Sequence, residues 1–431
     1  MISLDDARAH VLGSLAPLAP VAVPLAEALG CVLAEPVAAV EAIPPFANTA
    51  MDGFAVRAAD TVGATDDAPA VLTLVATLRA GQAPSATVGP GEAIRIMTGA
   101  PMPDGADAVV MVERTQVADD DATVLVLTEV PTGNHVRPAG DDLRPGQSVF
   151  EVGAVLSAGH LGVLASLGCR EITVVPRARV GVFSTGDELV EGPQALEPGQ
   201  IRDSNRITLL SLLAGSGCEG VDLGRIPDDE DAIAAAIERG AASCDALLTS
   251  GGVSMGDFDF VKVVLDRVGE MRWMQIAIRP AKPLAFGTVA GPDGSARVPV
   301  FGLPGNPVSS MVSFELFARP GLRLMMGHAA DELDRAHVLA VADDGLDRRP
   351  DGKVHFDRVV ARYDEADGAY HVRSAGQQGS HHLTAMATAN ALAVLPDGEA
   401  VPPGATVRVM LLGSDGSHAG PGADPGARPV P

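Results

Sequence analysis

Lysine is nearly absent from this chain of 431 residues, in which only Lys262, Lys282 and Lys353 occur. All basic residues together number 31 against 55 acidic ones, so the net charge is -24. Such an acidic chain is not a typical nucleic-acid binder, because the phosphate backbone is bound by clustered lysine and arginine. It can still bind a small anion if the few cations are gathered at one site. Because a compact ammonium group suits oxyanions, a lysine within a motif is informative.

The chain also lacks a cysteine framework and a membrane-spanning stretch. Four cysteines occur, far apart and without a C-x-x-C pair: Cys31, Cys169, Cys218 and Cys244. We expect buried free thiols rather than disulfides or a zinc ribbon. The apolar stretch at residues 15–29 is broken by three prolines, which excludes an uninterrupted spanning helix. The N-terminus carries Asp5 and Asp6 instead of a basic signal region. These features predict a cytoplasmic protein without a membrane partner.

The first part of the chain reads as a β-rich domain inserted into a smaller one. Residues 30–149 alternate short apolar runs with Gly and Pro turns, which predicts a β-rich domain II. Helical patterns lie on either side, at residues 4–15 and within residues 153–167. We expect these two helices to pack together, so that residues 1–29 and 150–176 form a discontinuous domain I.

Residues 177–325 change rhythm, and apolar strands alternate there with helices. This alternation predicts domain III, a central three-layer α/β domain with a mainly parallel sheet. Ligands of such sheets bind beyond the carboxyl ends of the strands. Residues 326–413 return to short strands and predict a small β-barrel, domain IV. The Gly- and Pro-rich tail at residues 414–431 has little to bury and is expected to be disordered.

Two short motifs match signatures whose structural context is wrong. Residues 215–220 fit G-x-G-x-x-G, but they follow an expected helix and precede an expected strand, so a helix C-cap is the better interpretation. Residues 252–256 fit the G-x-S-x-G elbow of serine hydrolases. Gly251 precedes this stretch and Asp257 follows it, which suits backbone donation to phosphate oxygens better than a nucleophile at a tight corner.

Three Gly-rich turns follow the expected strands of the α/β domain. Their residues are Ser184, Thr185 and Gly186; Ser250, Gly251 and Gly252; and Gly302, Leu303, Pro304, Gly305 and Asn306. Glycine lets the backbone approach a ligand closely, and backbone N–H groups there bind phosphate. Asn306 suits a helix N-cap and Pro307 the first helical position, while Ser309 adds a hydroxyl. The three turns together predict a phosphorylated ligand.

A pair of cations lies in a further turn. Arg279 and Lys282 are separated by Pro280 and Ala281 and followed by Pro283, after an apolar strand expected at residues 274–278. Two cations held three residues apart between prolines predict a rigid clamp for an anion. A solvated basic turn is the alternative.

Carboxylates gather near the same turns. They are Asp187, Glu188, Asp228, Asp229, Asp257 and Asp259. Carboxylates beside a phosphate would repel it unless Mg²⁺ intervenes, and Mg²⁺ prefers oxygen ligands and bridges to phosphates. Asp229 equally suits a helix N-cap, whereas for Asp259 we expect metal binding.

Seven motifs in a fixed order identify a family resemblance. They are PPFANTAMDGFAV (residues 44–56), IMTGAP (96–101), STGDEL (184–189), DSN (203–205), SGGVS (250–254), GLPGNP (302–307) and GSH (379–381). With these motifs the chain resembles bacterial molybdopterin molybdenumtransferase, which is related to plant molybdenum insertase and to the E domain of gephyrin. The resemblance runs from Asp5 to about Leu412.

The resemblance implies a reaction and an assembly. Adenylylated molybdopterin and molybdate would give molybdenum cofactor and AMP with the help of Mg²⁺. The protein would be a homodimer, in which domain III of one subunit and domain II of the other share a site. A scaffold that binds molybdopterin without catalysis is the alternative function. A competence-associated pyrophosphatase with a similar domain III is a weaker alternative, because that family lacks the motifs around Asp52 and Ser380.

Site residues carried over with the resemblance fall into four sets. The catalytic set is Asp52, Thr98, Asp142, Glu188 and Lys282. The set for the adenylyl phosphate and the pterin is Ser184, Thr185, Gly186, Asn205, Ser250, Gly251, Gly252, Pro304, Gly305 and Asn306. The molybdate set is Arg279, Lys282, Ser309, Arg358 and Ser380. The Mg²⁺ set is Asp259 with Asp228. The sequence departs from the family at Arg279, where lysine is frequent, and at Ala281, where glycine is frequent.

Overall fold

The computed structural model describes residues 1–431 except 120, 253–259, 293, 295–296 and 414–431. The chain divides into two compact units. The first unit consists of Met1–Val21, Gly30–Val32 and Val174–Pro431, and the second consists of Ala22–Leu29 and Leu33–Thr173. In sequence, the second unit is therefore inserted into the first.

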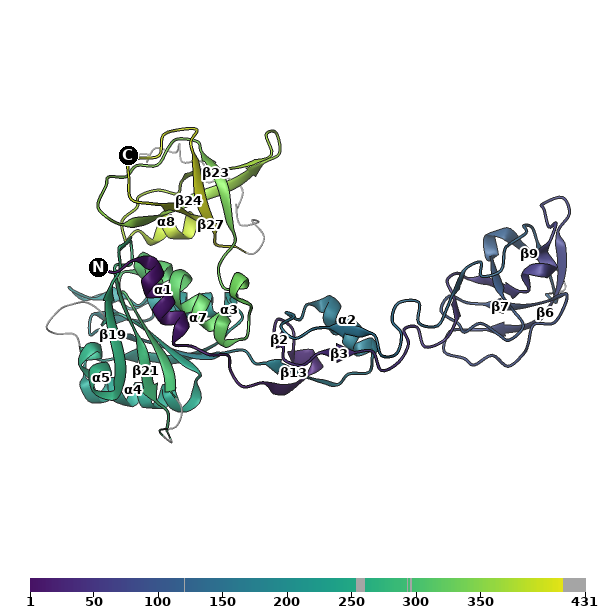
Figure 1. Ribbon diagram of the computed structural model, residues 1–431, viewed down its shortest axis with the longest axis horizontal. Helices are drawn as coiled ribbons and strands as arrows, with labels where there is room; N and C mark the ends of the chain where they lie inside the picture. Colours follow the sequence, from purple (N-terminus) through teal and green to yellow (C-terminus); the bar gives the residue numbers. More distant parts are fainter. Residues whose placement is uncertain (120, 253–259, 293, 295–296, 414–431) are drawn as a thin grey trace. The chain divides into compact units, whose positions relative to one another are not determined.

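The first unit contains a six-stranded mixed sheet (Figure 1). In spatial order its strands are β17 (Glu219–Ile226), β14 (Arg179–Thr185), β18 (Ala246–Ser250), β22 (Arg297–Leu303), β21 (Pro283–Ala290) and β19 (Gly269–Gln275). The first four strands are parallel, whereas β21 and β19 are added antiparallel at one edge. The predicted mainly parallel sheet is confirmed, with an antiparallel edge that the sequence did not indicate.

Helices cover both faces of this sheet, so the domain has three layers (Figure 1). One face packs against α1 (Leu4–Gly13), α3 (Asn205–Gly215), α6 (Pro307–Ser313), the π-helical segment Phe314–Ala318 and α7 (Arg319–Met325). The other face packs against α4 (Glu230–Ser243) and α5 (Phe260–Val268). In β14, Val180 and Val182 join the first core and Phe183 joins the second. Burial on both faces explains the continuous apolar runs of the parallel strands.

Helix α4 illustrates how local sequence sets these elements. The Asp229 side chain accepts the Ala232 N–H at 2.9 Å, which makes Asp229 the N-cap. Ile233, Ile237 and Ala241 follow at helical spacing and are buried against the sheet. The N-cap interpretation of Asp229 is therefore correct.

Helix α1 belongs to the first unit. Its buried residues Ala7 and Val11 join the core beneath α7, and α1 contacts α7 directly. The helix expected within residues 153–167 is α2 (Ala158–Ser166), which lies in the second unit. Within the first unit the buried face of α1 packs against α7, and a domain I of residues 1–29 and 150–176 stays a prediction.

The C-terminal part of the first unit forms a closed β-barrel. Its sheet order is β20 (Ile278–Arg279), β24 (Val354–Asp364), β25 (Ala369–Ser374), β23 (His337–Ala342), β27 (Thr406–Leu411) and β26 (Ala391–Leu395), with α8 (Leu383–Thr388) beside it. Pairing of β26 with β24 closes five of these strands into the predicted barrel. Residues 274–278 are not one strand: β19 ends at Gln275, and β20 begins at Ile278 in the barrel sheet.

The second unit is β-rich, as predicted. Its six-stranded sheet has the order β8 (Ala108–Met111), β5 (Gly53–Val56), β7 (Glu92–Ile96), β6 (Ala70–Leu78), β10 (Thr123–Val126) and β9 (Thr115–Val117). Short strands elsewhere are β1 (Val21–Pro24), β2 (Val32–Leu33), β3 (Val37–Ala38), β4 (Asn48–Thr49), β11 (Val136–Arg137), β12 (Ser148–Phe150), β13 (Glu171–Val175), β15 (Leu189–Val190) and β16 (Ile201–Arg202). Single 3-10 turns are Leu25–Glu27, Ala58–Thr61, Val112–Arg114 and Ala330–Glu332.

The cysteines are free thiols, as expected. Cys31, Cys218 and Cys244 are buried and Cys169 is partly buried. Burial raises the pKa of the Cys218 thiol to about 12, so this residue stays protonated and unreactive. Among the described residues, no helix is long and apolar enough to span a membrane.

Candidate functional site

The three Gly-rich turns meet at the carboxyl edge of the parallel strands. The Gly251 N–H donates to the Leu303 carbonyl at 3.1 Å, and a Cβ added at Gly305 would lie 3.6 Å from the Gly251 Cα. Gly251 has φ +97° and Gly252 has φ +70°, a conformation that other residues adopt only with strain. The turns after β18 and β22 are therefore in contact, and the backbone conformation at Gly251 favours glycine there.

Asn205, the first residue of α3, ties these two turns together. Its side-chain Nδ2 donates to Ser250 Oγ and to the Gly305 carbonyl, both at 2.7 Å. Its Oδ1 is buried and has no hydrogen-bond partner among the described residues. A buried polar atom without a partner costs about 1–3 kcal/mol, which points to a donor supplied by a ligand.

Ser184, at the end of β14, is already engaged. Its hydroxyl donates to Asp203 Oδ2 at 2.5 Å. The same Asp203 carboxylate accepts from the Arg206 Nε at 3.1 Å and the Arg206 backbone N–H at 3.2 Å. Ser184 thus presents lone pairs rather than its proton to a ligand. This geometry suits contact with a hydroxyl or an N–H group better than with a phosphate oxygen.

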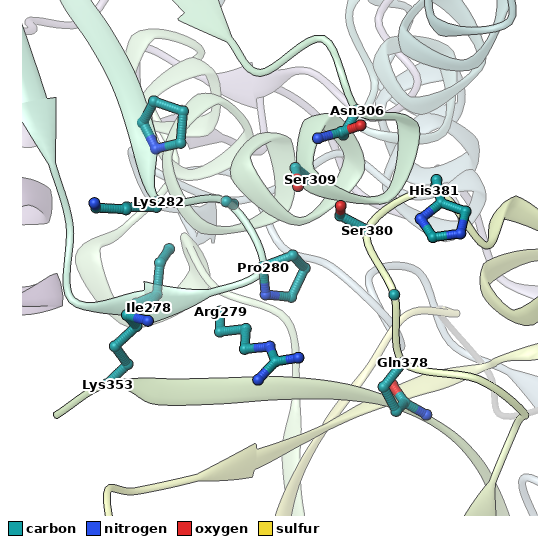
Figure 2. A pocket seen from close by; sticks show the side chains of 13 residues that line it. Ile278, Arg279, Pro280, Lys282, Asn306, Ser309, Lys353, Gln378, Ser380 and His381 are labelled. Carbon is teal, nitrogen blue, oxygen red and sulfur yellow. The ribbon is translucent and has the colours of Figure 1, made fainter. Parts of the chain in front are cut away.

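Two cavities adjoin the Gly302–Pro307 turn. The acidic cavity, of about 100 Å³, is lined by Ser184, Thr185, Glu188, Leu189, Ile201, Arg202, Asp203, Ser204, Asn205, Ser250, Gly251, Gly305 and Pro307. The cationic cavity, of about 450 Å³, is lined by Ile278, Arg279, Pro280, Ala281, Lys282, Pro283, Asn306, Ser309, Lys353, Gln378, Gly379, Ser380 and His381 (Figure 2). Gly305 and Pro307 line the acidic cavity, and Asn306 between them lines the cationic cavity. The two cavities are therefore neighbours.

The cationic cavity brings Arg279, Lys282 and Lys353 together, and none of the described residues that line it is acidic. It also contains two hydroxyls, those of Ser309 and Ser380, which Figure 2 shows close together. The Val308 N–H donates to the Ser380 carbonyl at 3.1 Å, which fixes the barrel loop to the start of α6. A site of this volume and charge fits a tetrahedral oxyanion together with part of a larger ligand.

The turn that carries two of these cations has an unusual backbone. Ala281 is buried and has φ +77°, in the left-handed region that glycine prefers. Arg279 belongs to β20 and is paired with His355 of the neighbouring strand β24. The clamp is thus held by the barrel on one side and by the α/β sheet, through β21, on the other.

Arg358 is the predicted molybdate residue that does not line the cavity. It is fully buried, and its guanidinium donates to the carbonyls of Gln377 and Gly379 at 3.3 Å. Burial lowers the pKa of Arg358. In this structure Arg358 supports the loop that carries Ser380 from behind, so its contribution is to position that loop.

The sequence reasoning missed three polar side chains of this cavity: Lys353, Gln378 and His381. Lys353 had a signal, the scarcity of lysine, but no motif surrounds it. His381 lies in the GSH motif, and its ring lies against that of His382 at a tilt, with ring centroids 4.0 Å apart. Gln378 had no signal, because its place depends on the fold of the barrel loop.

The carboxylates divide between the two turns after β14 and β17. The Asp187 N–H donates to Asp228 and the Asp228 N–H donates to Asp187, each at 3.3 Å. Glu188 lines the acidic cavity. Asp257 and Asp259 lie outside the described residues. Within the described part of the chain no group of three or more acidic, His or Cys side chains could enclose a metal. Mg²⁺ commonly uses one or two carboxylates with water and phosphate, a number that the Asp187 and Asp228 pair can supply.

Of the three predicted residues in the second unit, Asp52 and Thr98 are joined by hydrogen bonds. Asp52 accepts both the backbone N–H and the hydroxyl of Thr98 at 2.7 Å. These two hydrogen bonds lower the pKa of Asp52, so it is a carboxylate at neutral pH. Asp142 is exposed, and its backbone N–H donates to the Ile43 carbonyl.

Comparison with known proteins identifies the family of this chain. Residues 2–168 match the family "MoeA N-terminal region (domain I and II)", residues 181–324 match "Probable molybdopterin binding domain", and residues 347–412 match "MoeA C-terminal region (domain IV)". Molybdopterin molybdenumtransferase 2 of Mycobacterium tuberculosis (strain ATCC 25618 / H37Rv) is 39% identical over 403 residues, which cover 92% of this chain and 96% of that protein. The chain belongs to the molybdopterin molybdenumtransferase family. It is therefore a transferase of molybdenum cofactor biosynthesis.

Other members of the family support the same assignment. The molybdopterin molybdenumtransferase of Haemophilus influenzae is 37% identical over 397 residues, with 92% of this chain and 94% of that protein covered. The crystal structure of the molybdopterin biosynthesis moeA protein from Pyrococcus horikoshii OT3 has a TM-score of 0.74 and 29% identity. The match covers 95% of this chain and 100% of the Pyrococcus horikoshii chain. The fold and family expected from the seven motifs are confirmed.

Proposed function

We propose that this chain transfers molybdenum from molybdate to adenylylated molybdopterin and releases AMP in a Mg²⁺-dependent reaction. The observation that supports this proposal is the pair of neighbouring cavities with opposite charge. A reaction that joins a dianion to an anionic pterin must hold two mutually repelling groups a few ångströms apart. The cationic cavity suits molybdate, and the acidic cavity suits the adenylyl part with Mg²⁺.

In the acidic cavity, the chain's own groups would orient the nucleotide. The Asn205 Oδ1 lacks a donor, and Ser184 presents lone pairs, so both suit ribose hydroxyls or an amino group. The backbone N–H groups of the glycine turns suit the phosphate. When bound, Mg²⁺ would neutralise phosphate charge beside Glu188, Asp187 and Asp228, with Asp259 as a further proposed ligand.

In the cationic cavity, the proposed molybdate ligands are Arg279, Lys282, Ser309 and Ser380, with Arg358 holding the Ser380 loop. Each oxide that molybdenum loses to a thiolate leaves as water and takes up two protons, and a Mo–S bond replaces the Mo–O bond. No redox partner is needed for this exchange. Holding molybdate against the sulfurs in a fixed orientation can supply much of the rate.

We further propose that the protein acts as a homodimer in which Asp52, Thr98 and Asp142 of one subunit complete the site of the other. The fixed, ionised Asp52 would then contact the substrate or its Mg²⁺ from the partner subunit. Mixing an Asp52→Asn subunit with a Lys282→Ala subunit tests this arrangement. Hybrid dimers recover activity if the site is shared, and stay inactive if each subunit carries a complete site.

AMP release tests the catalytic proposal against the scaffold alternative. Purified protein is incubated with adenylylated molybdopterin and Mg²⁺, with and without molybdate. We expect AMP to appear with molybdate and the pterin product to contain molybdenum. Tight binding of both ligands without AMP or molybdenum transfer would favour a scaffold and contradict the catalytic proposal.

A further inference from the structure

Lys353 directly precedes β24, where the barrel meets the turn that carries Arg279 and Lys282. Its successor Val354 pairs with Ile278, and the Val354 N–H donates to the Ala277 carbonyl at 2.9 Å. The Lys353 carbonyl accepts from the buried Arg348 guanidinium at 3.0 Å. The backbone of Lys353 is therefore fixed on both sides, and its side chain lines the same cavity as Arg279 and Lys282 (Figure 2).

In this structure the Lys353 ammonium rests on Asp351, with Nζ 3.2 Å from Oδ2. Asp351 does not depend on this lysine. Its Oδ1 lies 3.1 Å from the His355 Nε2 and 3.6 Å from the Arg348 guanidinium. Burial alone would raise the pKa of Asp351, but hydrogen bonds from Lys353 and His355 lower it. If Lys353 moves away, Asp351 keeps its contact with His355 and with Arg348, which also pairs with Asp397 at 3.0 Å. Lys353 forms no ion pair with another acidic side chain among the described residues, so it is the cation that this cluster can release.

We propose that Lys353 is a third cation of the oxyanion site, stored on Asp351 and transferred to a tetrahedral dianion that binds between Arg279 and Lys282. This inference rests on the proposed function, because it takes the cationic cavity to be the molybdate site. Lysine suits the task because its ammonium is a point charge on a flexible stem, whereas the planar Arg279 is less free to reorient.

A mobile third cation has a consequence for selectivity. Two fixed cations already balance a dianion, and a third one adds most where the ligand charge is highest. Lys353 should therefore strengthen binding of molybdate and tungstate, which carry two negative charges. It should matter little for perrhenate, which has the same tetrahedral shape and a single charge.

The scarcity of lysine makes the transfer directly observable. Reductive ¹³C-methylation keeps lysines cationic and labels only Lys262, Lys282 and Lys353 besides the N-terminal amine. The signals are assigned with single Lys→Arg variants and followed by NMR during titration with molybdate. We expect the Lys282 and Lys353 signals to shift and the Lys262 signal to stay, because Lys262, on α5, lies over the ring of Trp273 of β19 and does not line the cavity. A Lys353 signal that stays fixed while Lys282 shifts would overturn the inference.

Binding constants test the same point in variants. In Lys353→Met we expect the Kd for molybdate to rise roughly tenfold, the usual scale for losing one hydrogen bond to a charged group, and the Kd for perrhenate to change far less. Lys353→Arg should restore part of the affinity, and Lys262→Met is the matched control. Asp351→Asn should tighten molybdate binding, because Lys353 no longer has to leave a carboxylate, and this gain should vanish in the double variant with Lys353→Met.

The same titration separates failure of this inference from failure of the proposed function. If Lys282→Met weakens molybdate binding and Lys353→Met does not, the cationic cavity is the molybdate site and the role of Lys353 is refuted. If neither variant changes the Kd, molybdate binds elsewhere and the proposed function fails with it. Thermal unfolding of each variant shows that the fold is retained.

Discussion

The acidic and cationic cavities lie on two sides of one turn, yet they are built on different principles. The acidic cavity is lined largely by residues at the ends of β14, β18 and β22 and at the start of α3, where Ser184, Asn205 and Ser250 are engaged in hydrogen bonds within the protein. The cationic cavity is made of long side chains from the α/β domain and the barrel, and the described residues lining it include no counter-ion. The acidic cavity therefore needs a metal ion before it can accept an anion, whereas the cationic cavity attracts an anion by its own charge.

The largest expected effect comes from removing a positive charge from the cationic cavity. In Lys282→Ala we expect molybdenum transfer to fall by about a hundredfold or more, because a charged hydrogen bond to the dianion is lost. AMP binding should change little, since Lys282 does not line the acidic cavity. Transfer assays and AMP titration calorimetry measure the two effects. Wild-type transfer by a folded variant would show that the two cavities do not divide the ligands in this way.

A second prediction concerns the acidic cavity. Asn205→Ala removes two hydrogen bonds that join the turns after β18 and β22. We expect about 1–2 kcal/mol lower stability and roughly tenfold weaker binding of AMP with Mg²⁺, whereas molybdate binding should stay close to that of the wild type. Denaturant unfolding and calorimetry provide the values. Ser211→Ala, on the exposed face of the same helix, is the control. Equal loss of both ligands would mean that the shared turn couples the cavities.

The smallest effect concerns the backbone of the clamp. Ala281→Gly should raise the free energy of unfolding by about 1 kcal/mol, because alanine at φ +77° is strained. Ala235→Gly in the middle of α4 is the matched control and should lower stability by a similar amount. Thermal or urea unfolding distinguishes the two signs. A destabilised Ala281→Gly variant would mean that the alanine methyl packs more favourably than its backbone is strained.

Local sequence predicted the acidic cavity better than the cationic cavity. The Gly-rich turns, the N-cap at Asp229 and the parallel strands depend on residues close in the chain, so their patterns were visible. The cationic cavity depends on the pairing of the barrel strand β24 with β20, in which Arg279 pairs with His355, 76 positions further along the chain. That pairing brings in Lys353 and sends the Arg358 side chain behind the loop instead of into the cavity. Neither outcome follows from a local motif.

The division of the site also explains why the family resemblance was needed for part of the prediction. Asp52 and Thr98 form their hydrogen bonds within the second unit, and nothing in their spacing indicates a ligand. Ser380 has no pattern of its own until the barrel loop is fixed by its hydrogen bond to Val308. Composition contributed differently: the scarcity of lysine drew attention to Lys282, which lines the cationic cavity.

The most direct test of the two-cavity account is a crystal soaked with tungstate, AMP and Mg²⁺ and measured at the tungsten absorption edge. We expect one strong anomalous peak within hydrogen-bond distance of Arg279, Lys282, Ser309 and Ser380, and AMP density against Asn205 and Ser250. A tungsten peak in the acidic cavity, or AMP density among the lysines, would contradict the account.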